Sequence, residues 1–252
     1  MTRWPLATSF VLLGSLLGSA PVAADDRDWP TWRHDPARTG RASVTSTLGE
    51  PTLAWALPAG GRYNPSTFLA ADLNGEPGPE LLLIRGGRLL AFAGATGQLL
   101  WDTPWLGFQQ IVGVADLDGV ASTREVVVTR STAPTSITVL DGRNGQHLWS
   151  SPAQAAGVSG YRREMVRLAD TSGDGRPEIL ASASKTGTFQ SFTGAANGGL
   201  APAWEASFTG YSNINPPIVA ELDGDPTDGG RPEFAFVSLT NVWVFNADDG
   251  SL

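Results

Sequence analysis

The side chains with the clearest chemical potential lie in one short loop. Asp170, Ser172, Asp174 and Glu178 occupy its positions 1, 3, 5 and 9, and a glycine follows the third position. Ca²⁺ binds six to eight oxygen atoms at about 2.3–2.6 Å, and oxygen-bearing side chains that alternate along a glycine-containing loop can fold around one such ion. The loop therefore predicts a metal site with Ca²⁺ as its cofactor.

Three further loops carry oxygen-bearing side chains at related spacings. The second has Val120 at position 5, and the fourth is lengthened by residues 226–230. We therefore expect Ca²⁺ to occupy the first and third loops more readily than these two. Ordinary turns remain the alternative, because Asp, Asn and Gly also favour turns. The additional predicted ligands are Asp72, Asn74, Glu76 and Glu80 in the first loop, Asp116, Asp118 and Glu125 in the second, and Glu221, Asp223, Asp225 and Glu233 in the fourth.

These loops recur because the whole chain repeats. Their first residues are 72, 116, 170 and 221, spacings that suit a four-stranded unit. In each repeat one apolar run enters the loop and a second leaves it, and runs this continuous suit strands buried on both faces. We expect four such units, at about residues 66–104, 110–151, 163–206 and 215–252.

A third strand in each unit ends at a turn, and a tryptophan follows the turn in the first three units. The turns at Gly97 and Gly145 need a glycine for positive φ, and each tryptophan can lie across the next unit and bury about 150–250 Å². The third strands are expected at 89–92, 137–140, 188–192 and 242–245, and the tryptophans are Trp101, Trp149 and Trp204.

The combination resembles two known kinds of repeat. The acidic loops resemble the FG-GAP/VCBS family of calcium-binding propeller repeats, although the Phe-Gly-Gly-Ala-Pro signature is absent. The Thr-Gly-x-x-x-Trp turns, with the Asp28–Gly40 segment ahead of them, resemble quinoprotein-like (PQQ-like) propellers. Together the resemblances cover roughly residues 28–252. They imply an all-β fold, a β-propeller of four-stranded blades.

The N-terminus predicts export. Residues 1–24 combine Arg3, an apolar run and small residues before a cut after Ala24, which is typical of a secretory signal peptide. An arm at 25–50 then leads into the repeats at 51–252. The chain has no cysteine, hence no lipobox and no disulfide, so we expect a secreted or periplasmic protein without membrane insertion after signal cleavage. A net charge of −8 argues against nucleic acid as a partner.

No catalytic set emerges from the residues. The two histidines, His34 and His147, are far apart in sequence, and no phosphate-binding glycine loop is present. We therefore expect a non-catalytic module that binds a protein or carbohydrate ligand. Two alternatives stay open: the propeller region of a polysaccharide lyase or hydrolase, and a quinone-dependent dehydrogenase. The aromatic residues in the links between repeats are candidate contacts, with the alternative that each simply covers a blade edge. They are Trp105, Phe108, Tyr161 and Tyr211.

One strand is left over. Thr52–Leu57 alternates like a strand and contains Trp55, while the fourth repeat ends inside its turn. The N-terminal strand could complete the last blade and close a four-bladed ring. The other possibility, which we expect, is a partial propeller.

Overall fold

We describe the fold from a computed structural model. It describes residues 52–58, 65–76, 78–120, 122–130, 136–152, 159–184, 188–194, 199–207, 216–224, 230–237 and 241–251. The predicted signal peptide and N-terminal arm lie outside these residues.

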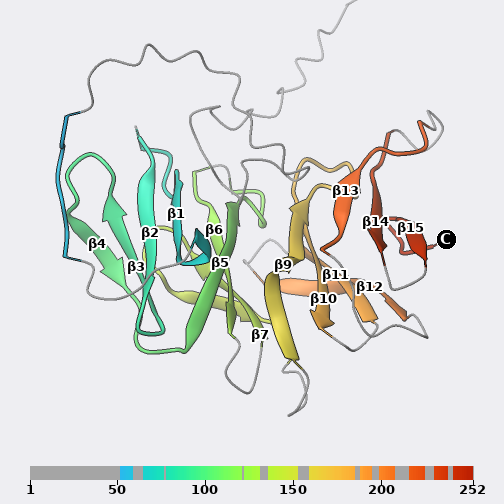
Figure 1. The fold of residues 1–252 in the computed structure, drawn as a ribbon. Coiled ribbons are helices and arrows are strands. Elements are labelled where there is room, and N and C mark those ends of the chain that lie inside the picture. The colour runs from blue at the N-terminus through green and yellow to red at the C-terminus, as the bar shows by residue number, and fades with distance from the viewer. Residues whose placement is uncertain are drawn as a thin grey trace, which may run out of the picture.

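Antiparallel sheets make up nearly all the regular structure of the described residues (Figure 1). The exception is η1, a short 3-10 turn at Pro65–Thr67. The first sheet holds β1 (Phe68–Ala71), β2 (Glu80–Arg85), β3 (Arg88–Ala93) and β4 (Leu99–Asp102), and the second holds β5 (Phe108–Ala115), β6 (Glu125–Arg130), β7 (Ser136–Asp141) and β8 (His147–Ser150). The third sheet holds β9 (Ser159–Ala169), β10 (Glu178–Ser184), β11 (Thr188–Gly194) and β12 (Leu200–Ser207), and the fourth holds β13 (Ile218–Ala220), β14 (Glu233–Val237) and β15 (Val242–Asn246).

In every sheet the strands follow chain order, so each sheet is a meander. The all-β prediction is confirmed: the fold is of the β-propeller class, with blades of four strands. The third blade begins at Ser159, ahead of the expected residue 163, and the fourth contains three strands among the described residues. No helix in this part of the chain has the length and apolar character needed to span a membrane.

The core lies between neighbouring sheets. One cluster of buried apolar side chains joins the first and second sheets, another joins the second and third, and another joins the third and fourth. β6 shows why three consecutive valines, Val126–Val128, lie in one strand. Val128 belongs to the first cluster and Val127 to the second, because successive side chains of a strand point to opposite faces. Both valines are fully buried.

Tryptophans connect successive blades in the way the sequence predicts. Trp55, Trp101 and Trp204 each donate a hydrogen bond to a backbone carbonyl in the turn that follows the third strand of the next blade, and each ring lies against a glycine of that turn. At Gly145, where φ is +71°, an added Cβ would come within 2.6 Å of the Trp101 ring. The bonds run from Trp55 to Gly94 at 2.8 Å, from Trp101 to Gly142 at 2.8 Å and from Trp204 to Ala247 at 3.0 Å.

The prediction of a strand at Thr52–Leu57 is wrong. Residues 52–58 pair with no strand among the described residues and lie beyond β4 at one end of the array (Figure 1). Only the tryptophan behaves as expected, because Trp55 docks on the turn of the first blade. The alternating pattern was sound, but a strand also needs a neighbour to accept and donate its backbone hydrogen bonds.

Candidate metal centres in the acidic loops

The four acidic loops connect the first and second strands of their blades and share one internal turn. In each loop the carboxylate at position 1 accepts a hydrogen bond from the backbone N–H of a glycine three residues later, a glycine that has positive φ. Such side-chain to backbone bonds are typical of turns built on Asp. All four bonds measure 2.7 Å and join Gly75 to Asp72, Gly119 to Asp116, Gly173 to Asp170, and Gly224 to Glu221.

The glutamate that ends each loop has a structural role that the sequence analysis missed. Glu80, Glu125, Glu178 and Glu233 each begin the second strand of a blade and are buried. Each accepts a hydrogen bond from the backbone N–H of the second residue of its own loop. The donors are Leu73 at 2.8 Å, Leu117 at 2.7 Å, Thr171 at 2.7 Å and Leu222 at 2.6 Å. The recurrence of a glutamate directly before an apolar strand was the available signal.

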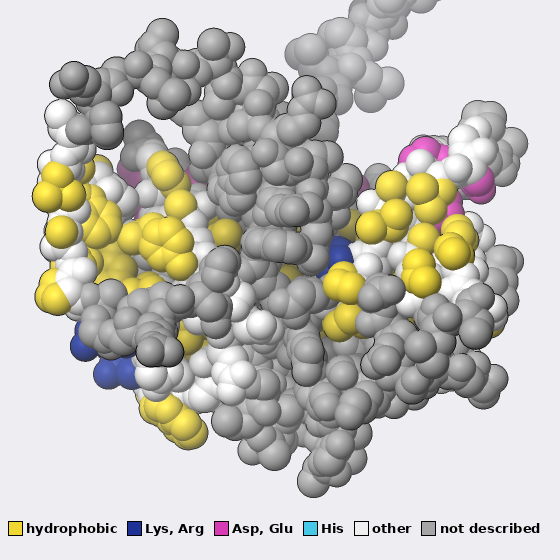
Figure 2. Space-filling model, in the orientation of Figure 1, with side chains coloured by type: hydrophobic (Ala, Val, Ile, Leu, Met, Phe, Trp, Pro, Cys, Tyr) yellow, Lys and Arg dark blue, Asp and Glu magenta, His cyan; other side chains and the backbone are white. Residues whose placement is uncertain are grey.

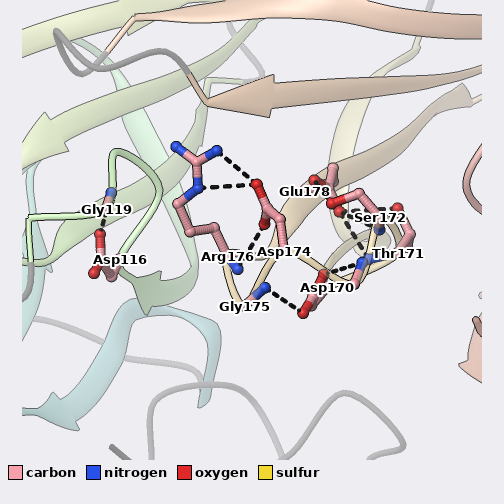
Figure 3. Close-up of polar contacts among 10 residues, drawn as sticks. Asp116, Gly119, Asp170, Thr171, Ser172, Asp174, Gly175, Arg176 and Glu178 are labelled. Carbon is pink, nitrogen blue, oxygen red and sulfur yellow. Dashed lines mark hydrogen bonds and ion pairs between the residues drawn. The ribbon is translucent and has the colours of Figure 1, made fainter. Parts of the chain in front are cut away.

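In the third loop the carboxylate oxygens of the predicted ligands already accept hydrogen bonds (Figure 3). Arg176 holds Asp174 through its backbone N–H at 2.9 Å and through two guanidinium bonds of 3.0 and 2.5 Å. Burial acts to raise the pKa of Asp174, but these hydrogen bonds outweigh it and leave the pKa lowered. Asp170 accepts a second bond from Gly175, at 2.8 Å.

Glu178 is satisfied at both of its carboxylate oxygens. Thr171 donates to Oε2 from its backbone N–H and, at 2.9 Å, from its hydroxyl, and the Ser172 hydroxyl donates to Oε1 at 3.1 Å. Ser172 and Glu178, both predicted ligands, therefore bond to each other. These bonds tie Glu178 to the second and third residues of its own loop.

The first loop is also closed by internal bonds. The Asn74 amide donates to Glu80 Oε1 at 3.2 Å, and its carbonyl accepts the N–H of Glu76 at 2.7 Å. Burial raises the pKa of Glu80, and the charge of Asp72 adds to this effect. Glu76 is exposed.

The second loop gathers three carboxylates. Oxygen atoms of Asp116, Asp118 and Glu125 all lie within 4.8 Å of one another. Burial and the neighbouring carboxylates raise the pKa of Glu125 to about 7, against the lowering effect of the Leu117 hydrogen bond. The positively charged side chain of Arg176 lies close to this loop, because it packs against Gly119 (Figure 3). A Cβ added at Gly119 would lie 3.2 Å from Arg176 Cδ.

The fourth loop gathers carboxylates of Glu221, Asp223 and Glu233, again within 4.8 Å of one another. Glu233 is 3% exposed, and its Oε1 is buried without a hydrogen-bond partner among the described residues. A buried carboxylate oxygen without a donor is costly unless an ion compensates it. These residues fit a hard cation. Asp225, the remaining predicted ligand of this loop, lies outside the described residues.

The chemistry available at these loops follows from their donor atoms. The gathered groups contain only carboxylate oxygens, which suit Ca²⁺ or Mg²⁺ better than metals that prefer nitrogen or sulfur. The first and third loops, which were predicted as the stronger sites, add side-chain bonds between their predicted ligands or to Arg176. Calcium binding itself stays a prediction.

The aromatic candidates for ligand contact divide into three groups. Trp105 is 66% exposed and is available on the surface. Phe108 is 2% exposed and belongs to the core cluster between the first and second sheets, so its prediction as a contact is wrong. An aromatic side chain at the start of a buried strand packs against the next sheet rather than facing water. The side chains of Tyr161 and Tyr211 lie outside the described residues.

Comparison with known proteins gives one distant sequence relative and similar folds. No family model matches the chain. Protein FAM234A from Bos taurus is 30% identical over 92 residues, which cover 36% of this chain and 16% of that protein. The chain therefore spans less than a fifth of this curated relative.

Three solved structures resemble the fold. BamB from Moraxella catarrhalis has a TM-score of 0.43 and 18% identity, with 67% of this chain and 46% of that chain covered. A europium-containing methanol dehydrogenase has a TM-score of 0.45 and 14% identity over 73% of this chain and 41% of its own. The C-terminal domain of PilY1 from Pseudomonas aeruginosa has a TM-score of 0.46 and 14% identity over 72% of this chain and 48% of its own. Similarity at this level does not transfer a function.

Proposed function

We propose that this chain is a calcium-stabilised, non-catalytic β-propeller module that acts outside the cytoplasm and binds a protein or glycan ligand. The single observation that carries the calcium part is the fourth loop. Its three carboxylates converge, and Glu233 Oε1 is buried without a hydrogen-bond donor among the described residues. Like charges held this close repel one another unless a cation lies between them.

The fourth loop is a better calcium site than the third in this proposal. Arg176 supplies a positive charge to Asp174 of the third loop and also lies beside the second loop. A Ca²⁺ ion in either loop would therefore compete with its guanidinium group. In the fourth loop, Glu233 keeps a buried carboxylate oxygen without a donor among the described residues. The fourth loop would therefore gain the most from Ca²⁺.

Binding rather than turnover is proposed because the blades form a scaffold and the links between them carry accessible surface. Blade-to-blade packing fixes the positions of the links, which is the arrangement that recognition surfaces need. Trp105 offers an exposed indole between the first and second blades. Such a ring can stack on a sugar or insert into a protein surface. The extracytoplasmic location rests on residues 1–24, which have the pattern of a secretory signal peptide.

Thermal unfolding tests the calcium part. An extracellular site with a dissociation constant near 10⁻⁴ M would stabilise the fold by about 1.4 kcal/mol at about 1 mM Ca²⁺. We expect the midpoint to rise with Ca²⁺ and to return to its starting value with chelator. Equal midpoints with chelator and with Ca²⁺ would refute it.

A ligand screen tests the binding part. The chain is applied to glycan and secreted-protein arrays, and any hit is repeated with Trp105→Ala. A parallel dye-reduction assay with added quinone measures dehydrogenase activity. Binding without dye reduction is expected, and quinone-dependent reduction would establish an enzyme instead.

A further inference from the structure

Arg130 carries a charge that no described residue balances. It is half-buried at the end of β6, and its Nε is buried without a hydrogen-bond partner among the described residues. It is also not among the arginines that form ion pairs in this part of the chain, which are Arg88, Arg143, Arg176 and Arg231. A partly buried charge is costly unless an opposite charge compensates it. An arginine left without one in a chain of net charge −8 indicates a place for an anion from outside.

The acidic loop of the same blade lies too far away to supply that anion. Glu125 begins β6 and Arg130 ends it, so the strand separates them by about 17 Å. Because every sheet is a meander, the acidic loops lie at one end of the strands and the links between blades at the other. Figure 2 shows acidic side chains on the upper part of the visible face and basic side chains at its lower left. Asp102, an acid at the link end, is already paired with Arg88.

The Arg130 side chain faces the first blade. Val128, two residues earlier in β6, belongs to the core cluster between the first and second sheets. Phe108 lies directly opposite Arg130 and belongs to the same cluster. Alternate residues of a strand share one face of the sheet, and so do directly opposite residues of an antiparallel pair. The guanidinium therefore lies at the link end of the boundary between the first and second blades.

The link into β5 holds an exposed indole at the same boundary. The backbone N–H groups of Leu106 and Phe108 both donate to Gly87 O, at 3.2 and 3.1 Å. Trp105 lies against Gly87, where an added Cβ would come within 2.7 Å of the indole Nε1, and it is 66% exposed. The Cα of Trp105 is at most about 11 Å from that of Phe108. Because these bonds fix the link, the ring is in position before a ligand arrives.

We propose that Arg130 and Trp105 form a binding site for an acidic glycan, an oligosaccharide that carries carboxylate groups. This inference rests on the proposed binding function and names the class of its ligand. A ligand carboxylate accepts charge-assisted hydrogen bonds from the planar guanidinium. A neighbouring sugar ring stacks on the Trp105 indole, which offers a flat apolar face with a polar edge. The exposed ring favours a sugar over an acidic peptide, because charged peptide side chains would leave that apolar face uncovered.

Calorimetric titration tests the site. The probes are oligomers of galacturonate, mannuronate and glucuronate, together with a neutral galactose oligomer and a glutamate peptide. A chelator is present throughout, so that no Ca²⁺ joins the probe carboxylates to the acidic loops. We expect a uronate oligomer to bind more tightly than the neutral oligomer and the peptide. Arg130→Gln should weaken that binding about tenfold or more, because the charge-assisted hydrogen bond is lost.

Arg143→Gln is the matched control, because Arg143 is paired with Asp141 at 2.9 Å at the acidic-loop end of the second blade. It should leave uronate binding unchanged, whereas Trp105→Ala should weaken it. Equal binding by the parent chain and Arg130→Gln overturns the inference, and so does a probe order in which the neutral oligomer or the peptide binds as tightly. No binding of any uronate oligomer also overturns it. A protein or neutral-glycan hit in the array screen would then leave the proposed function standing.

Thermal unfolding without ligand gives an independent test of the same residue. If the Arg130 charge serves a ligand and not the fold, its removal takes away an uncompensated charge. Arg130→Gln is therefore expected to unfold at the same temperature as the parent chain or at a higher one. A clearly lower midpoint would make Arg130 a structural residue and overturn the inference.

Discussion

Equivalent glutamates of this chain sit in different electrostatic surroundings. Glu178 and Glu233 occupy the same place, at the start of the second strand of a blade, and both accept a backbone N–H from their own loop. Glu178 also receives the hydroxyls of Thr171 and Ser172, whereas Glu233 keeps one buried oxygen without a donor among the described residues. Two hydroxyl side chains thus decide whether both oxygens of the glutamate receive a donor.

Glycine substitution separates backbone strain from tryptophan packing. At Gly173, where φ is +77° and no atom lies within 4 Å of an added Cβ, we expect Gly173→Ala to cost about 1–2 kcal/mol from the left-handed conformation alone. At Gly145 the added Cβ also meets the Trp101 ring, so Gly145→Ala should cost clearly more. Urea unfolding measures both, and equal losses would mean that the indole moves aside freely.

At the scale of elements, the blades depend on indole contacts that join one sheet to the next. Trp101→Phe keeps an aromatic ring but removes the hydrogen bond to Gly142 O. We expect a loss of about 1–2 kcal/mol, because a carbonyl is left without its donor and the smaller ring fills less space. The matched control, Trp105→Phe, changes an exposed indole and should stay within about 0.5 kcal/mol of the parent chain. Chemical denaturation that ranks the two variants in the reverse order contradicts this account.

The strands could be predicted from the sequence because their apolar runs recur with the same turns and tryptophans. The third strands expected at 137–140 and 242–245 lie within β7 and β15. The error at Thr52–Leu57 came from the opposite situation, a local pattern whose pairing partner is absent among the described residues. Pairing is a property of two segments, and a one-dimensional pattern describes only one of them.

The site was less predictable than the strands. Spacing identified the carboxylates, but it could not show that the Arg176 side chain would turn back onto Asp174 and reach the second loop. It also could not show whether Glu178 and Glu233 would find donors. Hydrogen-bond partners of loop side chains depend on how the loop folds, which spacing alone leaves open.

At the scale of the whole molecule, stability should vary along the array. Each core cluster joins neighbouring sheets, so the second sheet packs on both faces while the fourth packs against the third alone among the described sheets. Repeat arrays with nearest-neighbour contacts open from their less supported units. We expect hydrogen exchange to be slowest in β6 and β7 and faster in β14 and β15. Equal protection in both regions would mean that the sheets unfold as one unit.

Direct measurement of calcium binding tests the central claim. Isothermal titration of the chain with Ca²⁺ is compared with the same titration of Glu233→Gln and of Glu178→Gln, two changes of the same size at equivalent loop positions. We predict that Glu233→Gln removes a binding event and that Glu178→Gln retains it, because Glu233 has the buried oxygen without a donor and Glu178 does not. Binding heats unchanged by Glu233→Gln, or no binding by the parent chain at millimolar Ca²⁺, would contradict the account.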